Sequence, residues 1–327
     1  MTEKCGKITR ENRRSDGICA KPAAKGGACT VRIERANAKI NLYLNILSRR
    51  ENGYHNIVSL MQTVSLCDLV SVDFRPSSHT SIRLQASGND AMPTDCRNLA
   101  WRAAELFLGT VGRTGEVLIS IEKHIPMAAG LAGGSTDAAA VLRALNLLTG
   151  SPLTQDELCA LGARLGADIP FCILGGAALV TGIGEELAPM PNMPACHTVV
   201  ACMGEGVSTP AAYRALDEKY GNFEISMPPD ERIDRLCEGL KAGALSLVSD
   251  NLFNLFEEVV PLTHPCVDRL KAVMLQAGAT HAMMSGSGPS VFGIFKDAAS
   301  AEAACQALLS EGAAAFVCHP RPQYREI

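Results

Sequence analysis

Residues 126–136 form a glycine-rich run that leads directly into a predicted helix over 138–148. Small residues let a backbone approach an anion closely, and the first free amides of a helix, together with its dipole, favour negative charge. We therefore predict a phosphate-binding loop, with Ser135 or Thr136 capping the helix and Gly150 ending it. The helix itself is predicted from apolar residues at three-and-four spacing, namely Ala138, Val141, Leu142, Leu145 and Leu148.

An ordinary connection would also be rich in glycine, so the residues around the loop matter. Residues 117–121 are rich in β-branched side chains and precede the loop, which gives the order strand, loop, helix that nucleotide-binding loops share. No Gly-Lys-Ser or Gly-Lys-Thr follows, so the lysine of a Walker sequence is missing, and the glycine spacing is not that of a dinucleotide fingerprint. Backbone amides and hydroxyl groups would therefore bind the phosphates.

The composition narrows the class of protein. The chain has 327 residues, enough for two domains, with 20% charged residues and a net charge of −4, so we expect no nucleic-acid partner. No stretch reaches the roughly 18 apolar residues of a membrane span, so no membrane partner is expected either. The 13 cysteines are scattered without a Cys-x-x-Cys pair, which favours reduced thiols in the cytoplasm over zinc or disulfides. No oligomeric state is indicated.

Residues 1–30 differ from the rest of the chain. They hold seven Lys or Arg, three acidic residues and almost no large apolar side chain, so we predict a disordered extension. The segment lacks the apolar core of a secretory signal, and its acidic residues are untypical of an organelle transit peptide. The ordered chain is expected to begin near Val31.

Apolar and polar residues alternate over 38–46, which predicts a half-buried strand. Lys39 and Asn41 share its polar side. A lysine in such a place is most often solvated, although both side chains could instead face a ligand.

A polar turn over 49–57 follows and contains Tyr54 and His55. One interpretation is a hairpin turn with the tyrosine packed on the surface. The other is a platform on which Tyr54 stacks a base while His55 hydrogen-bonds its edge.

Asp168 stands after a predicted helix that ends at Gly166 and two residues before Pro170. This is a natural position for a helix N-cap, and the residues alone favour capping over catalysis. Farther along, residues 175–185 predict turn, strand and turn. Residues 206–213 predict a second passage from loop to helix, and residues 284–293 place glycines and hydroxyls before an apolar strand.

Together and in this order, the motifs resemble the GHMP small-molecule kinases over about residues 33–320. Three family motifs occur in sequence: the lysine on the first strand, the glycine-rich loop, and Gly286-Ser287-Gly288 near the C-terminus. Within the family, Gly53-Tyr54-His55 and Gly166–Phe171 are similar to the branch whose substrate is cytidine-diphosphate methylerythritol. Gly53-Tyr54-His55 is the discriminating element, because the other branches have no cytosine to hold.

The resemblance implies an enzyme that transfers phosphate from ATP, with Mg²⁺, to the 2-hydroxyl of this substrate in non-mevalonate isoprenoid synthesis. Asp168 would accept the hydroxyl proton, and Lys39 would keep Asp168 ionised and offset the charge of the transferred group. No protein ligand of the metal is assigned. The triphosphate would lie on the loop, formed by Pro126, Met127, Ala128, Ala129, Gly130, Leu131, Ala132, Gly133, Gly134, Ser135 and Thr136.

For the second substrate, the resemblance implies that cytosine lies between Tyr54 and Tyr213, with His55 reading the base edge and Asn41 beside Lys39. Asp137 and the pair Ala128-Ala129 depart from a more glycine- and asparagine-rich loop in some relatives, which implies altered amide geometry or nucleotide affinity at most.

Two other hypotheses stay open. One is a kinase of the same family for another alcohol, such as mevalonate or homoserine, and the other is a binding protein without turnover.

The fold that the resemblance implies is α/β in two lobes. Residues 31–180 would form the nucleotide-binding lobe and residues 181–327 the C-terminal lobe, with the active site between them.

Overall fold

The computed structural model describes residues 18–19, 31–223 and 230–324. The predicted disordered extension therefore lies outside the described residues, apart from Ile18–Cys19, which form strand β1. Strand β2 begins at Val31. Among the described helices, none combines the length and the apolar character that a membrane crossing needs.

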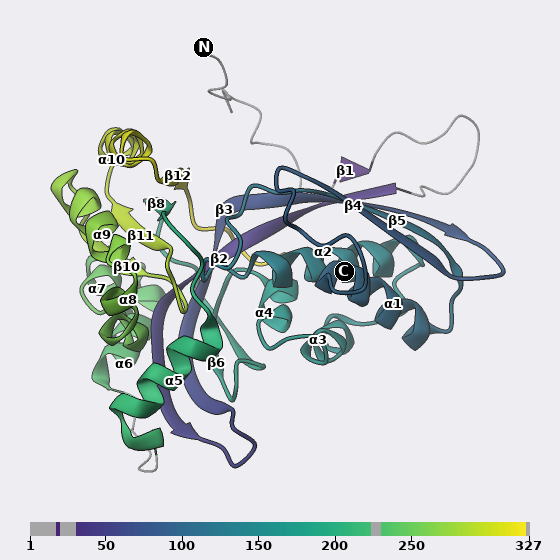
Figure 1. The fold of residues 1–327 in the computed structure, drawn as a ribbon, viewed down its shortest axis with the longest axis horizontal. Coiled ribbons are helices and arrows are strands. Elements are labelled where there is room, and N and C mark those ends of the chain that lie inside the picture. The colour runs from purple at the N-terminus through teal and green to yellow at the C-terminus, as the bar shows by residue number, and fades with distance from the viewer. Residues whose placement is uncertain (1–17, 20–30, 224–229, 325–327) are drawn as a thin grey trace.

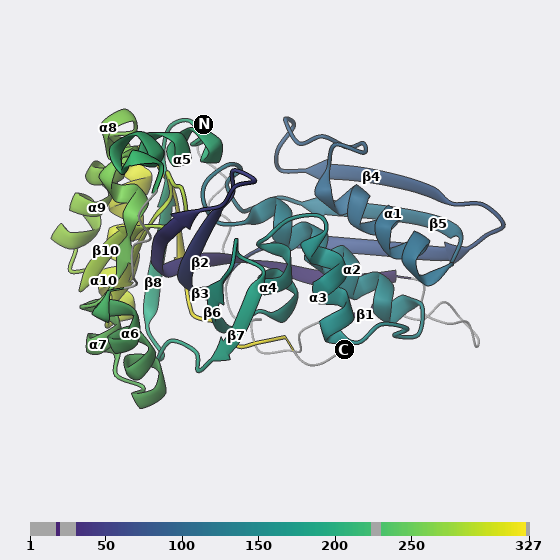
Figure 2. The same cartoon turned by 90° about the horizontal axis from the view of Figure 1, so that it is seen from below.

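Two sheets organise the fold, and Figures 1 and 2 show each with its own group of helices. The first sheet runs in the order β1-β2-β3-β5-β4, with β6 paired to β3, β7 paired to β6, and β9 paired to β2. Its strands are β1 (Ile18–Cys19), β2 (Val31–Arg49), β3 (His55–Pro76), β4 (Ser81–Ser87), β5 (Gly115–Glu122), β6 (Ala177–Thr181), β7 (Glu186–Met190) and β9 (Phe253–Asn254). The helices packed on it are α1 (Leu99–Val111), α2 (Gly133–Leu148), α3 (Gln155–Ala163) and α4 (Ile169–Leu174).

The second sheet is antiparallel in the order β10-β11-β8-β12. Its strands are β8 (His197–Cys202), β10 (His281–Met284), β11 (Val291–Phe295) and β12 (Ala314–Cys318). The helices of this lobe are α5 (Thr209–Lys219), α6 (Glu231–Ala242), α7 (Leu245–Ser249), α8 (Val260–Thr263), α9 (Cys266–Gln276) and α10 (Ala298–Ser310), with the 3₁₀ turns η1 (Gly221–Phe223) and η2 (Leu255–Glu258). The predicted mixed α/β architecture is confirmed.

The long hairpin of β2 and β3 connects the two lobes (Figure 1). Ile40 and Leu42 on β2 pack with Phe292 of the second sheet in one apolar core. The alternate side chains of β2, including Lys39 and Asn41, are also buried. The prediction of a half-buried strand over 38–46 is therefore wrong, because both faces of this part of β2 are covered, one by the core and the other by the polar groups of the site.

The C-terminal segment returns to the first lobe. Pro320 forms a bridge with Val64, and Gln323 forms one with Gly175 at the end of α4. β7 and β9, which follow residue 180 in the chain, also join the first sheet. The division at residue 180 stays a prediction, with these segments crossing it.

Candidate active site

A single cavity of about 900 Å³ contains most of the predicted site residues. Its walls come from β2, from the turn between β2 and β3, from the glycine-rich loop with the start of α2, and from α5. Gly286 and Ser287, from the loop between β10 and β11, complete it. Segments of both lobes thus line the same space.

The glycine-rich loop packs against the loop between β10 and β11. Ser285 Oγ donates a hydrogen bond to the Gly130 carbonyl at 3.1 Å, and the Ser290 amide donates to the Ala129 carbonyl at 3.3 Å. Gly130 has a φ of +75°, and a Cβ there would lie 2.0 Å from the Ser285 carbonyl oxygen. Only glycine allows the two loops to approach this closely.

Helix α2 starts differently from the prediction. Its N-cap residue is Ala132, with a left-handed φ of +58° and no side-chain capping bond, so the expected cap by Ser135 or Thr136 is wrong. Both hydroxyl residues lie within the first turn. The Thr136 hydroxyl instead donates to the Asn37 carbonyl at 2.8 Å. The first amides of the helix keep no intrahelical acceptor and remain the donors for an anion.

The loop residues do not all face the cavity. Leu131 and Thr136 are buried outside its lining, and the Leu131 carbonyl accepts the Lys39 amide at 3.2 Å. The Ser135 hydroxyl has no hydrogen-bond partner among the described residues. The members that line the cavity are Pro126, Met127, Ala128, Ala129, Gly130, Ala132, Gly133, Gly134 and Ser135.

A chain of hydrogen bonds fixes the position of the Lys39 ammonium. Its ammonium donates to Asn41 Oδ1 at 2.6 Å, Asn41 Nδ2 donates to Ser59 Oγ at 2.9 Å, and Ser59 Oγ donates to the Tyr43 carbonyl at 2.6 Å. Lys39 is only 5% exposed, so it is not the solvated lysine of the alternative interpretation. Lys39 and Asn41 both line the cavity, and their contact with a ligand stays a prediction.

Asp168 occupies the N-cap position of α4, but its side chain makes no capping bond. Among the described residues its carboxylate has no hydrogen-bond or ion-pair partner, and the residue lines the cavity. Capping therefore does not account for the side chain. The carboxylate remains available to a ligand.

The charges of Asp168 and Lys39 both act on the pKa of one buried neighbour, Cys172. Burial raises the pKa of the Cys172 thiol, the Asp168 charge raises it further, and the Lys39 charge lowers it. Asp168 also adds to the effect of burial in raising the pKa of Tyr213. Lys39 and Asp168 both line the cavity, and they form no direct ion pair among the described contacts.

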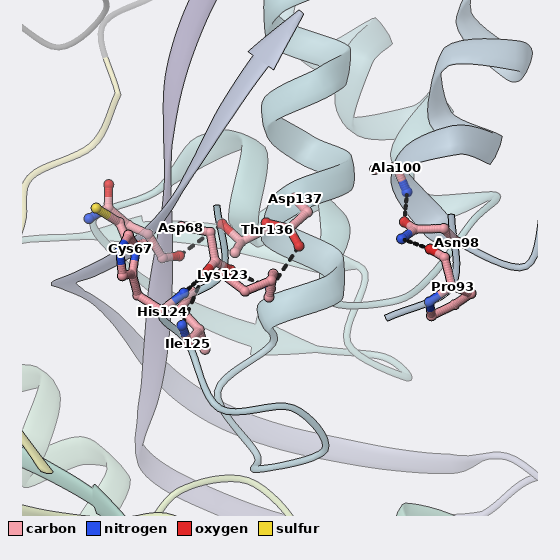
Figure 3. Close-up of polar contacts among 11 residues, drawn as sticks. Cys67, Asp68, Pro93, Asn98, Ala100, Lys123, His124, Ile125, Thr136 and Asp137 are labelled. Atoms are coloured by element: carbon pink, nitrogen blue, oxygen red, sulfur yellow. Dashed lines mark hydrogen bonds and ion pairs between the residues drawn. The ribbon is translucent and has the colours of Figure 1, made fainter. Parts of the chain in front are cut away.

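A buried charge cluster lies beside the start of α2 (Figure 3). The Lys123 ammonium contacts Asp68 and lies 2.8 Å from Asp137 Oδ2. Asp68 Oδ1 also accepts the amides of His124 and Ile125 at 2.6 and 2.9 Å. Burial raises the pKa of Asp137 to about 7, against the lowering effect of Lys123, and the Asp68 charge raises it further. Asp137 Oδ1 is buried and has no hydrogen-bond partner among the residues that the structure describes.

At the β2–β3 turn, the structure brings His55 against α5. The imidazole stacks on Tyr213 with ring centroids 4.7 Å apart, and its Nε2 lies 2.7 Å from Asp217 Oδ1. Tyr54 is 60% exposed and lines the cavity. Its ring makes no described contact with Tyr213, one face of which is covered by His55. A base held between the two tyrosines stays a prediction.

Sequence reasoning missed three groups of the site: Asp217, Lys123 and Asn98. Asn98 lines the cavity and caps α1 by accepting the Ala100 amide at 2.9 Å (Figure 3). Asp217 and Lys123 join the site through contacts with residues distant in the chain, His55 and Asp68. Asp137 could have indicated Lys123. This position departs from the glycine- and asparagine-rich loop of some relatives, and a buried carboxylate there requires a cation nearby.

Comparisons with known proteins identify the family. Residues 98–176 match the model of the GHMP kinases N-terminal domain, and residues 236–314 match that of the GHMP kinases C-terminal domain. A 4-diphosphocytidyl-2-C-methyl-D-erythritol kinase from Lachnospira eligens is 40% identical over 86% of this chain and 94% of its own. The protein of the same name from Gloeobacter violaceus is 43% identical over 88% and 94%.

Solved structures share the fold. A crystal structure of 4-(cytidine 5'-diphospho)-2C-methyl-D-erythritol kinase has a TM-score of 0.71 and 34% identity, covering 88% of this chain and 98% of that one. Homoserine kinase from Cytophaga hutchinsonii has a TM-score of 0.70 at 19% identity, covering 92% and 98%, which indicates the fold alone. The chain therefore belongs to the GHMP kinase family, where it groups with the 4-diphosphocytidyl-2-C-methyl-D-erythritol kinases, and it is an ATP-dependent small-molecule kinase.

Proposed function

We propose that this chain transfers the γ-phosphoryl group of ATP to the 2-hydroxyl of 4-diphosphocytidyl-2-C-methyl-D-erythritol. The observation that carries the proposal is that one cavity is lined by the glycine-rich loop, by Lys39 and Asp168, and by the Tyr54-His55 turn. The loop would bind the phosphates of the donor, Lys39 and Asp168 would contact the reacting hydroxyl, and the Tyr54-His55 turn would bind the nucleobase. The relatives that share most of this chain carry the name of this activity.

The nucleotide would place its phosphates on the loop. The free amides at the start of α2 and the Ser135 hydroxyl donate to phosphate oxygens, and the helix dipole favours their charge. The cavity continues past the loop to Met92, Pro93 and Leu99, where an apolar wall is available for the adenine.

Magnesium fits this donor set. The described residues offer no group of three or more His, Cys, Asp or Glu for a metal, and Mg²⁺ in kinases takes most of its ligands from phosphates and water. The Ser135 hydroxyl, which has no hydrogen-bond partner among the described residues, would coordinate the ion through an oxygen lone pair while its hydrogen is donated to a phosphate oxygen. The bound ion would neutralise charge on the phosphates.

In the reaction, the substrate oxygen forms a bond to the γ-phosphorus while the bond from this phosphorus to the β,γ-bridging oxygen breaks and ADP leaves. Asp168 accepts the hydroxyl proton, for which its unpartnered carboxylate is suited. Lys39, fixed by Asn41, supplies positive charge where negative charge accumulates. The protein contributes positioning and electrostatic stabilisation, which is most of what phosphoryl transfer needs.

The test is Asp168→Asn, which keeps the shape of the side chain and removes its basicity. We expect kcat to fall by about 10²- to 10⁴-fold, with the Kd for ATP little changed, because the group acts on the proton alone. Asp156→Asn is the matched control, since Asp156 is an exposed carboxylate of α3 outside the cavity. Full activity of the Asp168 variant in steady-state assays would remove the base from the mechanism.

We also propose a reducing compartment, the cytosol, as the place of this reaction. Every cysteine side chain that the structure describes is a free thiol. Several are buried, and burial raises the pKa of thiols such as Cys196, to about 11, so they behave as small apolar residues of the core.

A further inference from the structure

Arg143 is a buried cation in the middle of α2, ten residues after the helix begins at Gly133. It is only 2% exposed and lies outside the lining of the cavity. Helix α2 packs against both β2 and α4. β2 carries Lys39, α4 begins beside Asp168, and α2 itself starts at the glycine-rich loop. The three elements that carry the proposed reaction therefore meet around one helix.

The guanidinium of Arg143 bonds to both of the other elements. Its Nη1 donates to the Cys172 carbonyl of α4 at 2.8 Å, and its Nη2 donates to the Arg35 carbonyl of β2 at 3.3 Å. Its Nε lies 3.3 Å from Glu34 Oε2, so a buried carboxylate of β2 balances its charge. The planar guanidinium presents its donors in fixed directions. One side chain thus holds β2 and α4 at a defined spacing.

Each bonded carbonyl is close in the chain to a group of the proposed reaction. The Cys172 amide donates a helical hydrogen bond to the Asp168 carbonyl at 3.1 Å. Arg35 lies four residues before Lys39 on β2. Because Lys39 and Asp168 form no direct ion pair among the described contacts, their separation depends on how these two elements are held.

The C-terminal segment reinforces the same bridge. The Tyr324 ring lies over the Arg143 guanidinium, with its centroid 3.8 Å from Cζ. The Tyr324 amide donates to the Leu174 carbonyl of α4 at 3.1 Å. Its hydroxyl contacts the Arg35 carbonyl of β2 at 3.1 Å. Carbonyls in the last turn of α4, which lack donors within the helix, thus obtain partners from Arg143 and Tyr324.

The glycine-rich loop is joined to β2 by separate bonds. The Leu131 carbonyl accepts the Lys39 amide at 3.2 Å, and the Thr136 hydroxyl donates to the Asn37 carbonyl at 2.8 Å. Neither bond involves Arg143. Loss of the guanidinium would therefore leave the phosphate-binding loop in place and loosen α4, which carries Asp168 at its start.

We infer that Arg143 is a positioning residue for phosphoryl transfer, which fixes Asp168 relative to Lys39 by bridging α4 and β2. The inference rests on the proposed function, because it takes Asp168 as the base. Reacting groups must be held to within about 0.5 Å, and a displacement of about 1 Å can lower the rate by about 10²-fold. Arg143 acts through the backbone of the two elements, from outside the cavity.

The first test separates catalysis from binding. Arg143→Lys keeps the charge that balances Glu34 but replaces the fork of donors by a single ammonium. We expect kcat to fall about 10- to 100-fold, with the Kd for MgATP within about 2-fold of the wild type. An unchanged kcat would overturn the inference.

Asn146→Ala is the matched control for lost stability. Asn146 is buried three residues farther along α2, and its side chain bonds to the carbonyl and the amide of Leu153, away from the bridge. Its replacement removes buried hydrogen bonds from the same helix and should keep the wild-type kcat per folded molecule. A loss of kcat equal to that of Arg143→Lys would overturn the inference, because any damage to α2 would then suffice.

The second test asks whether Arg143 acts through Asp168. A double-mutant cycle combines Arg143→Lys with Asp168→Asn. If the guanidinium positions the base, Arg143→Lys should lower kcat by less than about 3-fold once the base is absent. An equal loss in both backgrounds is what a merely structural role gives, and it would overturn the inference.

The outcomes distinguish failure of the inference from failure of the proposed function. Wild-type protein that does not turn over the cytidine substrate, or Asp168→Asn with full activity, refutes both. An active wild type that is impaired by Asp168→Asn but keeps its kcat in Arg143→Lys refutes only the role of Arg143. If Arg143→Lys does not fold, Arg143→Met combined with Glu34→Gln removes both buried charges together and gives the same two comparisons.

Discussion

Replacing Asp137 by Asn should change how the stability of this protein depends on pH. The buried cluster beside α2 contains one cation, Lys123, and two carboxylates, Asp68 and Asp137. Asp137 Oδ1 has no partner, and burial raises the pKa of the group from 3.8 to about 7. The asparagine removes the excess negative charge and leaves one ion pair.

The sign and size of the change in unfolding free energy follow from the number of protons that the folded and unfolded states bind. Between pH 5 and pH 7 the unfolded chain has lost the Asp137 proton while the folded chain keeps it, so the folded state loses about 1.4 kcal/mol of stability for each pH unit. Above pH 7 both states are ionised and this loss stops. The unfolding free energy of the wild type should therefore fall by about 3 kcal/mol relative to Asp137→Asn between pH 5 and pH 8.

Urea unfolding of both proteins at pH 5, 6, 7 and 8, followed by circular dichroism, measures this difference. Asp156→Asn is the control, because this exposed carboxylate on α3 should leave the pH profile of the wild type unchanged. A constant difference between wild type and Asp137→Asn across the range would refute the argument. It would mean that Lys123 holds Asp137 ionised in spite of burial.

Two further predictions concern the contacts between distant segments. Gly130→Ala should lower the free energy of unfolding by more than the roughly 1–2 kcal/mol that a left-handed φ costs, because its Cβ would meet the Ser285 carbonyl. Gly150→Ala, with a φ of +90° and open space, measures the backbone cost alone, and equal losses in urea unfolding would contradict the close approach. Tyr324→Phe should cost about 1–2 kcal/mol, since its single hydroxyl proton is shared between the Arg35 carbonyl at 3.1 Å and Asn37 Oδ1 at 3.0 Å. An unchanged urea midpoint would show that the C-terminal segment is held by Arg143, which lies over the Tyr324 ring, and not by the hydroxyl.

Local patterns predicted the elements that carry the site. The apolar spacing over 138–148, the β-branched run over 117–121 and the turn over 49–57 all correspond to elements of the structure, because each is decided by neighbours in the chain. The start of α2 could not be predicted in this way. Ala132 takes the N-cap position in a left-handed conformation with a φ of +58°, so the helix starts before Ser135 and Thr136.

The polar partners of the site depend on contacts that no local pattern contains. Asp217 meets His55 across 162 residues, and Lys123 meets Asp68 across 55. The burial of Lys39 likewise requires distant segments, because the Leu131 carbonyl accepts its amide and its ammonium lies beside Gly286 of the β10–β11 loop. The sequence motifs therefore indicated the kind of reaction. The groups that orient the site residues and balance their charge could be identified only from the folded structure.

The measurement that tests the central claim most directly is ADP release by purified protein with MgATP and 4-diphosphocytidyl-2-C-methyl-D-erythritol, beside mevalonate, homoserine and galactose at equal concentration. We expect turnover with the cytidine substrate alone. Turnover only with another alcohol would keep the kinase and contradict the cytosine site at Tyr54 and His55, while no turnover with any alcohol would contradict the catalytic role of Lys39 and Asp168.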